Sequence, residues 1–338
     1  MGGDYGPSIT IPGVKLALQN YPDLFILLVG RQESLRPFLQ KYKLENHPRV
    51  QVVHASEVVE MDESPASALR GKKDSSMRVA LNLVKEAKAQ ACVSAGNTGA
   101  LMATSRFVLK MLPGIDRPAI MYSLPTLDPI SQQTARVHML DLGANVDCKD
   151  EHLFQFAVMG SVLSSQVDGL ASPKVALLNI GEEQMKGLEV IKRAAQKISE
   201  CQALNYIGYV EGTDILKGKA NVIVCDGFVG NVALKTMEGV VRYIASHVKL
   251  AFNHSLFTRL CGFLAWPVFR VIRQKLDLRR HNGASLLGLK GIVVKSHGGA
   301  KAEAFATALG EAFHEVKKDI PNKIHALIDE ILGKEDVR

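Results

Sequence analysis

The sequence predicts an α/β fold with three layers, in which a mostly parallel sheet is covered by helices on both faces. Short apolar or β-branched runs alternate with segments of helical periodicity along the chain, and this alternation is typical of parallel sheets. Of the 338 residues, 47% are hydrophobic and 22% are charged, which is an ordinary globular composition and excludes a disordered chain or a disulfide scaffold. We expect a single domain over residues 1–338, because no repeat or linker divides it.

Nine short runs are predicted as strands because they are rich in Val, Ile, Leu and Ala, and most of them end in Gly, Asn or Asp. In chain order they are residues 24–30, 50–55, 91–94, 119–124, 137–143, 174–180, 206–210, 220–226 and 291–296. Six segments carry apolar residues at helical spacing and are predicted as helices. They are residues 76–89, 99–112, 151–166, 187–200, 232–250 and 301–318. The Pro-rich loop 123–131 is the candidate seam between two subdomains.

Cysteine usage and hydropathy indicate a protein of the reducing cytoplasm. The five cysteines are scattered, odd in number and without a CxxC pair, so we expect buried free thiols and no structural zinc site. No stretch reaches 18 uncharged apolar residues, so a membrane-spanning helix is not expected. Residues 1–4 contain neither the basic nor the apolar part of an export signal.

The net charge of +7 is concentrated in one segment. Residues 247–281 contain seven Lys or Arg and one acidic residue, Asp277, whereas the rest of the chain is nearly neutral. We therefore expect no nucleic-acid partner, and the basic segment needs a local explanation.

Loops rich in Gly, Asn and Ser follow five of the predicted strands. They are residues 94–100, 141–147, 179–183, 226–231 and 295–299. Ligands of α/β folds bind outside the carboxyl ends of the strands, where glycines permit a close approach of the backbone and helix N-termini favour an anion. Turn chemistry alone explains a single loop of this kind, but five at the same type of junction predict a phosphate or carboxylate site.

Common nucleotide, hydrolase and zinc-protease motifs are missing from the sequence. It contains no GxxxxGK[ST], no GxGxxG after a strand, no GxSxG and no HExxH. No group of Asp, Glu and His has convincing metal-ligand spacing. We therefore expect activity without a metal, a nucleotide or another cofactor.

Six segments together resemble one family. They are MGGDYGP at 1–7, SAGNTGA at 94–100, DLGANVD at 141–147, NIGEE at 179–183, CDGFVGN at 225–231 and KSHG at 295–298. In this order, over residues 1–331, they are similar to the bacterial acyl-[acyl-carrier-protein]:phosphate acyltransferases of phospholipid synthesis, the PlsX family.

The resemblance implies a soluble enzyme that converts a long-chain acyl-[acyl-carrier-protein] thioester and inorganic phosphate into an acyl phosphate. That product feeds a downstream membrane glycerol-3-phosphate acyltransferase. The family fold is similar to the phosphotransacetylase and isocitrate-dehydrogenase-like group, usually as a homodimer. The resemblance thus implies acyl carrier protein, inorganic phosphate and a second copy of the chain as partners.

One departure from the family concerns the first residues. In the family a short apolar strand precedes the Gly-Gly-Asp loop, whereas here Met1 begins that loop. Loss of a central strand leaves the hydrogen-bonding groups of its neighbours unpaired. We therefore expect unpaired strand edges in this form.

Phosphate attack on a thioester requires a held dianion, a stabilised oxyanion and a thiolate that leaves. The loops 96–99 and 227–231 are predicted to form the phosphate cradle. Their candidate residues are Gly96, Asn97, Thr98, Gly99, Gly227, Gly230 and Asn231. The resemblance adds Gly181 to this phosphate-binding set.

Further candidates concern charge and proton transfer. Asn145 and Asn179 are candidate donors to the oxyanion or the phosphate. Lys235 or Lys295 is expected to neutralise developing charge. His297 is a candidate acid or base, although a structural hydrogen-bonding role is the alternative. The last candidates are carboxylates, which repel phosphate and are therefore expected to orient loops: Asp4, Asp147 and Asp226.

Two other functions are compatible with the sequence. A non-catalytic membrane-bound scaffold for acyl carrier protein would explain basic patches, which suit an acidic helical partner, but it leaves the Gly/Asn loops unexplained. A phosphotransacetylase acting on small acyl groups differs from the first interpretation in its acyl-chain-length preference.

Residues 251–280 are predicted to form a protruding amphipathic helical hairpin with its tip at Trp266-Pro267. The predicted membrane-contacting residues are Leu256, Phe257, Leu260, Phe263 and Trp266. Apolar faces with a basic fringe are typical of an interfacial anchor on an anionic membrane surface. This interpretation places the protein in the cytoplasm, peripherally associated with the inner face of the cell membrane. The alternative is that these faces pack in a dimer interface or in the core.

Overall fold

The computed structural model describes residues 1–127, 134–276 and 283–335. The strands are β1 Ile26–Gly30, β2 Val50–His54, β3 Ala91–Ser94, β4 Ala119–Leu127, β5 Thr134–Leu140, β6 Lys174–Leu178, β7 Asn205–Val210, β8 Val222–Val224, β9 Ala284–Leu287 and β10 Ile292–Lys295. All nine predicted strands are confirmed with small shifts at their ends. The sequence prediction omits β9, because its four residues contain no β-branched side chain and directly follow a basic segment.

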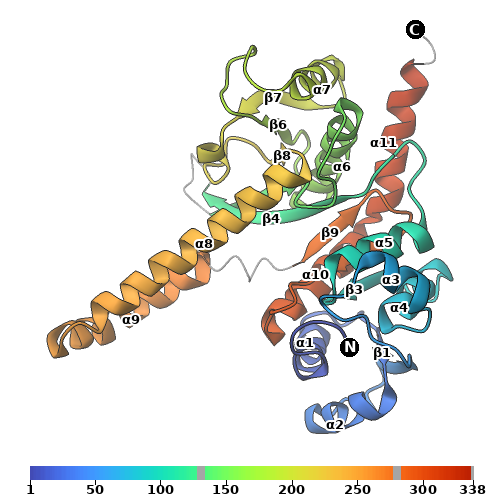
Figure 1. The fold of residues 1–338 in the computed structure, drawn as a ribbon, viewed down its shortest axis with the longest axis vertical. Coiled ribbons are helices and arrows are strands. Elements are labelled where there is room, and N and C mark those ends of the chain that lie inside the picture. The colour runs from blue at the N-terminus through green and yellow to red at the C-terminus, as the bar shows by residue number, and fades with distance from the viewer. Residues whose placement is uncertain (128–133, 277–282, 336–338) are drawn as a thin grey trace.

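The helices complete the three layers seen in Figure 1. They are α1 Pro7–Asn20, α2 Gln32–Tyr42, α3 Pro65–Gly71, α4 Ser76–Lys85, α5 Thr98–Leu109, α6 Asp150–Asp168, α7 Glu189–Glu200, α8 Gly227–Phe252, α9 Leu256–Leu276, α10 Ala302–Lys318 and α11 Ile320–Glu335, with a 3₁₀ turn at Gly212–Asp214. The six predicted helices are confirmed. Four others, α1, α2, α3 and α11, are missed, and internal prolines obscure the helical pattern in two of them, Pro12 in α1 and Pro37 in α2.

The strands form one eight-stranded sheet with the order β3-β10-β9-β4-β5-β8-β6-β7 and a two-stranded sheet, β1-β2. Neighbouring strands are mostly parallel, and the antiparallel pairs are β10-β9, β9-β4 and β4-β5. Because of these three antiparallel pairs, β3 and β10 run in the opposite direction to β5, β8 and β6. The loops after β3 and β10 therefore lie at the opposite end of the strands from the loops after β5, β8 and β6.

Two apolar layers hold the helices on the sheet. On one face α4, α5 and the start of α8 cover a core that includes Leu101, Leu124 and Ile223. On the other face α6, α7 and α11 enclose a second core around Phe156 and Ile324. The helix α10 packs against β10 on this second face. The sheet is therefore buried on both faces, as parallel strands require.

The Pro-rich loop predicted at 123–131 is partly a strand. Residues 123–127 belong to β4 and pair with β5, while residues 128–131 lie outside the described residues. Pro125 is tolerated there because β9 pairs only with residues 119–121 of β4, so no described strand pairs with the other edge of β4 at Pro125. The described part of this segment is thus strand and not loop.

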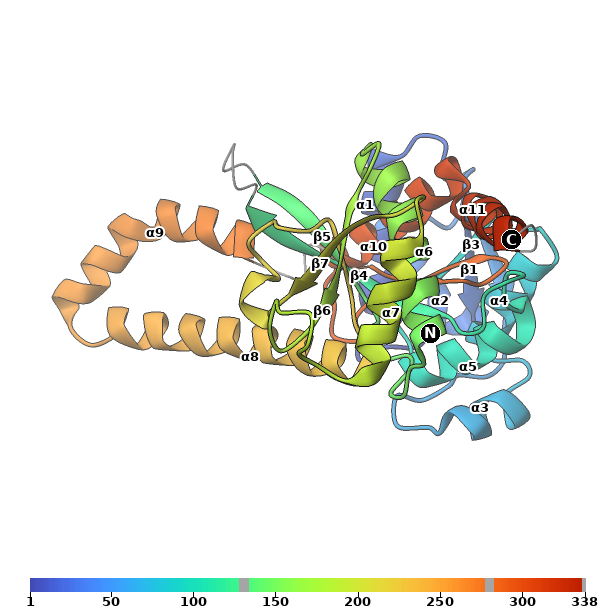
Figure 2. The same cartoon turned by 90° about the horizontal axis from the view of Figure 1, so that it is seen from above.

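The helices α8 and α9 project side by side from the sheet as a two-helix arm (Figures 1 and 2). The turn of this arm lies at residues 253–255, so the predicted tip at Trp266 is wrong. α9 continues through Pro267 because its neighbour supports it, and the rings of Phe252 and Phe269 meet edge to face at 5.0 Å. None of the helices in the described ranges is long and apolar enough to cross a membrane. Residues 277–280 of the predicted hairpin lie outside the described residues.

Two strand edges near Met1 lack a strand partner within the described chain. β1 pairs only with β2, and β3 pairs only with β10. A groove of about 350 Å³ lies between them and is lined by Met1, by all but the last residue of β1 and by the whole of β3. This groove therefore separates the open edges of the two sheets.

Candidate active site

Three loops distant in sequence meet at the carboxyl ends of β3 and β10. We call them the Lys295 cluster: residues 1–6, 94–99 and 295–299. The Asp4 N–H donates to the Gly298 carbonyl (3.1 Å). A Cβ on Gly2 would lie 2.9 Å from the Cα of Gly96, so only glycine permits this approach. The close packing brings Asp4 and the end of β10 together.

Lys295 is the last residue of β10 and its side chain is buried, with 7% exposed. Its Nζ donates to the Ser296 carbonyl. Burial lowers the pKa of Lys295 to about 8, and the Asp4 carboxylate opposes that shift. A buried ammonium group of this kind attracts an anion strongly, because few waters screen it.

The N-terminus of α5 lies in the same cluster. The first N–H groups of a helix have no partner within the helix, and here the Asn97 Oδ1 accepts that of Ala100 (3.0 Å). Among the described residues the N–H groups of Thr98 and Gly99 have no partner, so together with the positive end of the helix dipole they can bind an anion. Thr98 itself is exposed.

His297 lies at the exposed rim of the Lys295 cluster. Its Nδ1 accepts the N–H of Gly299 (3.1 Å), which orients the ring. Its exposed position also leaves it accessible to a substrate.

The side-chain amide of Asn97 hydrogen-bonds to other residues of the chain and so does not provide the predicted phosphate donor. Its Nδ2 donates to the carbonyls of Met61 (2.9 Å) and Glu63 (2.9 Å), with a longer contact to that of Glu60 (3.4 Å). Its Oδ1 caps α5. Both ends of this amide are therefore occupied.

A second cluster forms at the carboxyl ends of β5 and β8 around Asp141, which the sequence reasoning did not select. The buried carboxylate accepts N–H groups of Ile120 (2.9 Å), Ala144 (3.1 Å) and Asn145 (2.7 Å). Burial raises the pKa of Asp141, and these hydrogen bonds oppose the shift. The signal in the sequence was the Asp at the first position of a loop rich in N–H groups.

The amide groups predicted as donors in this region are used internally. Asn145 Nδ2 donates to Asp141 (2.9 Å) and to the Pro118 carbonyl (2.8 Å), so both of its hydrogens are taken. Asn179 Nδ2 donates to the Lys186 carbonyl (3.0 Å), and its buried Oδ1 has no partner within the described chain. Asn145 therefore has no free amide hydrogen for an oxyanion, whereas Asn179 donates one of its two amide hydrogens and keeps the other.

The start of α8 is also closed to an anion. Asp226 Oδ1 accepts the Val229 N–H (2.8 Å), and the Gly227 N–H donates to the Asn145 carbonyl (2.7 Å). A Cβ on Gly230 would lie 2.0 Å from the Asp141 carbonyl oxygen. Glycines 227 and 230 are thus required for packing, and two carboxylates nearby repel phosphate.

The remaining candidates lie near this second cluster and outside the Lys295 cluster. Asn231 is half-buried beside Gly143 and makes no side-chain hydrogen bond to the described residues. Lys235 and Asp147 are exposed, and the Asp147 carbonyl accepts from Arg117 (2.9 Å). Gly181 is buried; a Cβ there would lie 2.3 Å from the Lys186 Cδ.

The two predicted halves of the phosphate cradle do not meet. β9 and β4 separate β10 from β5, which at the usual strand spacing is roughly 15 Å, and the loops lie at opposite edges of the sheet. The loops 96–99 and 227–231 therefore belong to different clusters. The sequence could not reveal this, because strand direction is decided by pairing and not by local composition.

The described ranges contain scattered thiols and scattered metal-ligating side chains. No three His, Cys, Asp or Glu side chains are grouped there as metal ligands. All five cysteines are free thiols, and burial raises the pKa of Cys92 to about 12.

Comparison with known proteins agrees with this architecture. Residues 1–323 match the model of a family described as fatty acid synthesis protein. The chain is 55% identical to the phosphate acyltransferase of Alkalilimnicola ehrlichii and 52% identical to that of Halorhodospira halophila. Each alignment covers 99% of this chain and 96% of the relative.

The solved structures with the same fold are more distant. A phosphotransacetylase from Streptococcus pyogenes has a TM-score of 0.60 at 18% identity over 92% of this chain and 91% of its own. One from Staphylococcus aureus has a TM-score of 0.57 at 17% identity over 92% of each chain. These likenesses concern the fold, whereas the full-length identity to the relatives above decides the family: the chain belongs to the phosphate acyltransferases.

Proposed function

We propose that this phosphate acyltransferase transfers a long-chain acyl group from acyl carrier protein to inorganic phosphate at the Lys295 cluster. The observation that carries the location is the buried Lys295 ammonium, set beside the N-terminus of α5 among loops of glycine. In the Asp141 cluster, by contrast, a buried carboxylate accepts the N–H groups of Ile120, Ala144 and Asn145, and Asp226 accepts that of Val229.

The transfer needs electrostatics more than covalent catalysis. A phosphate oxygen attacks the thioester carbonyl, a C–O bond forms, the C–S bond breaks and the carrier thiolate leaves. Lys295 and the N–H groups of Thr98 and Gly99 hold the phosphate dianion and offset the charge that develops. His297, at the exposed rim, is the candidate acid that protonates the leaving thiolate.

The direct test supplies purified protein with long-chain acyl-[acyl-carrier-protein] and radiolabelled phosphate. We expect label in acyl phosphate and release of one carrier thiol for each label incorporated. A parallel reaction with acetyl coenzyme A separates this function from that of a small-acyl phosphotransacetylase. Binding of acyl carrier protein without phosphate-dependent thiol release would instead support the scaffold interpretation.

We also propose that the arm formed by α8 and α9 contacts the anionic inner face of the cell membrane, where a downstream membrane acyltransferase uses the product. Large apolar side chains of α9 face solvent: Leu256 is 83% exposed, Phe263 77% and Trp266 59%. Arg259 and Arg270 lie on the same helix. An amphipathic helix with this composition binds lipid interfaces, and each cation near an anionic surface contributes about 1 kcal/mol.

We expect Leu260→Glu and Phe263→Glu to abolish sedimentation with anionic liposomes, because a charge replaces an exposed apolar group at the interface. High salt should release the unmodified protein. Turnover of soluble substrate should be unchanged. The matched control is Met185→Glu, which changes a residue that is 82% exposed on the body of the protein, and it should still sediment.

The same variants test the alternative use of the arm. A homodimer is the other proposed partnership, and exposed apolar helices also suit an interface with a second copy. If the glutamate variants lose a dimer in light scattering, the arm is an interface and the membrane proposal is wrong.

A further inference from the structure

A segment that the sequence did not single out covers the Lys295 cluster. We call residues 57–65 the flap. A Cβ on Gly298 would lie 2.9 Å from the Met61 Cε, and one on Gly99 would lie 2.9 Å from the Pro65 Cγ. Gly2, in the third loop, faces the Val59 carbonyl at 4.0 Å by the same measure. Each loop of the cluster thus contributes a glycine against the flap.

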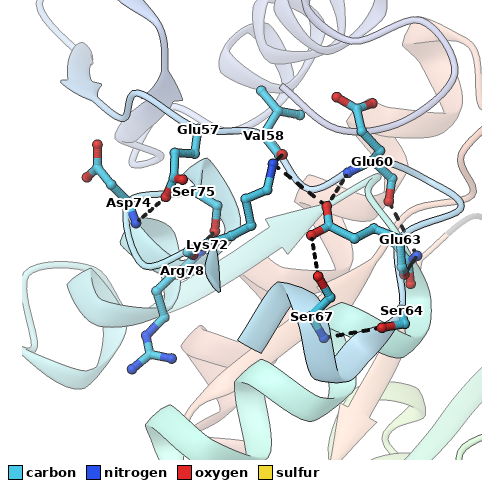
Figure 3. Close-up of polar contacts among 11 residues, drawn as sticks. Glu57, Val58, Glu60, Glu63, Ser64, Ser67, Lys72, Asp74, Ser75 and Arg78 are labelled. Carbon is cyan, nitrogen blue, oxygen red and sulfur yellow. Dashed lines mark hydrogen bonds and ion pairs between the residues drawn. The ribbon is translucent and has the colours of Figure 1, made fainter. Parts of the chain in front are cut away.

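The flap is braced by one hydrogen bond within it and by contacts with Ser67 and Lys72, as Figure 3 shows. The Glu63 carboxylate accepts the Glu60 N–H (3.3 Å) and the Ser67 hydroxyl (3.3 Å). Lys72 Nζ lies 3.9 Å from Glu63 and donates to the Val58 carbonyl (3.0 Å). These contacts tie the flap to α3 and to Lys72, the residue that follows that helix.

One side chain joins the tip of the flap to the cluster. Asn97 donates to three carbonyls of the flap, those of Glu60, Met61 and Glu63, although these residues precede it by more than 30 positions. The same residue caps α5, whose first N–H groups are proposed to bind phosphate. The position of the flap is therefore coupled to the phosphate-binding end of the helix.

We propose that the flap excludes water from the Lys295 cluster and that Asn97 is the positioning residue that holds it closed. This inference rests on the proposed acyl transfer to phosphate. Water and phosphate compete for the same thioester carbonyl. Phosphate attack yields acyl phosphate, whereas attack by water forms the C–O bond of a free fatty acid; in both cases the C–S bond breaks and the thiol is released. A closed cover favours the bound phosphate over water.

The test separates the two roles of Asn97, capping of α5 and attachment of the flap. Asn97→Ser and Asn97→Asp retain a side-chain oxygen that can cap α5, but they lose the amide that reaches the flap. We expect the ratio of free fatty acid to acyl phosphate to rise about tenfold, as for the loss of one or two net hydrogen bonds. Amide hydrogens of the flap should exchange faster. The matched control is Asn205→Ser at the start of β7. This substitution removes an amide that donates to the Ser172 carbonyl.

The possible results lead to different conclusions. If both Asn97 variants show an unchanged product ratio and unchanged amide exchange in the flap, the proposal that Asn97 holds the flap closed is wrong. A parallel fall of transfer and hydrolysis together with a lower Tm assigns Asn97 a structural role only, and also overturns it. If the unmodified protein shows no phosphate-dependent transfer, the proposed function fails, and the exchange experiment alone then decides whether Asn97 holds the flap.

Discussion

Lys295→Met is expected to reduce kcat/KM for phosphate by at least about 10²-fold, the usual effect of removing one preorganised group that stabilises developing charge. The folded state should persist, because an apolar side chain of similar length replaces a buried ammonium that has lost most of its water. The measurement is the initial rate against phosphate concentration at saturating acyl-[acyl-carrier-protein].

The rate of the unmodified protein should also depend on pH through the charge of Lys295. Since the pKa of Lys295 is lowered to about 8, its charge is lost as the pH rises through that value, and kcat/KM for phosphate should fall above it. Lys295→Met should lack this alkaline fall. Lys290→Met, which changes an exposed lysine just before β10, is the control and should resemble the unmodified protein. A loss below threefold in Lys295→Met would move the reaction away from this cluster.

Glu315→Gln is expected to stabilise the protein at alkaline pH. Glu315 lies on α10, is 4% exposed and accepts the hydroxyl of Ser285 on β9. Burial raises its pKa from 4.5 to about 8, and the neighbouring Glu311 adds to the shift. The folded state therefore holds a proton that the unfolded state releases between these values, so stability falls as the pH rises through this window.

The size of this effect follows from the shift. At about 1.4 kcal/mol per pKa unit, ionising Glu315 costs roughly 4–5 kcal/mol in full. Gln keeps a hydrogen bond to the hydroxyl and does not titrate. Urea unfolding should show the advantage of the variant growing by roughly 2–3 kcal/mol between pH 6 and pH 9. Glu303→Gln, on the exposed side of the same helix, serves as the control. Parallel pH profiles of the Glu315 variant and the unmodified protein would contradict a buried neutral carboxyl.

The Asp141 cluster joins β4, β5 and the start of α8. Asp141 links the end of β5 to the start of β4 through the Ile120 N–H, and Gly230 lets α8 pack against its backbone. The motif residues 141–147 and 226–231 thus fix the root of the projecting arm. Packing accounts for Gly227 and Gly230, and the bond to Asp141 accounts for Asn145.

The sequence by itself determined the type and order of most elements. Periodicity is local, so the runs that became β5, β6 and β8 and the long apolar segment of α6 could be recognised without knowing their neighbours. Six segments of sequence were enough for the family. A short strand such as β9, and helices interrupted by Pro12 or Pro37, were missed because packing overrides their weak local preference.

Only the tertiary structure decided which candidates act together. The sequence contained Lys295 and Lys235 as equivalent possibilities, but the three antiparallel pairings between β10 and β5 put them at opposite ends of the strands, in different clusters. It likewise showed Asn97 as a free amide, whereas folding brings three carbonyls from residues 60–63 to it. Burial, strand direction and hydrogen-bond occupancy depend on contacts between residues far apart in the chain, and no local pattern specifies them.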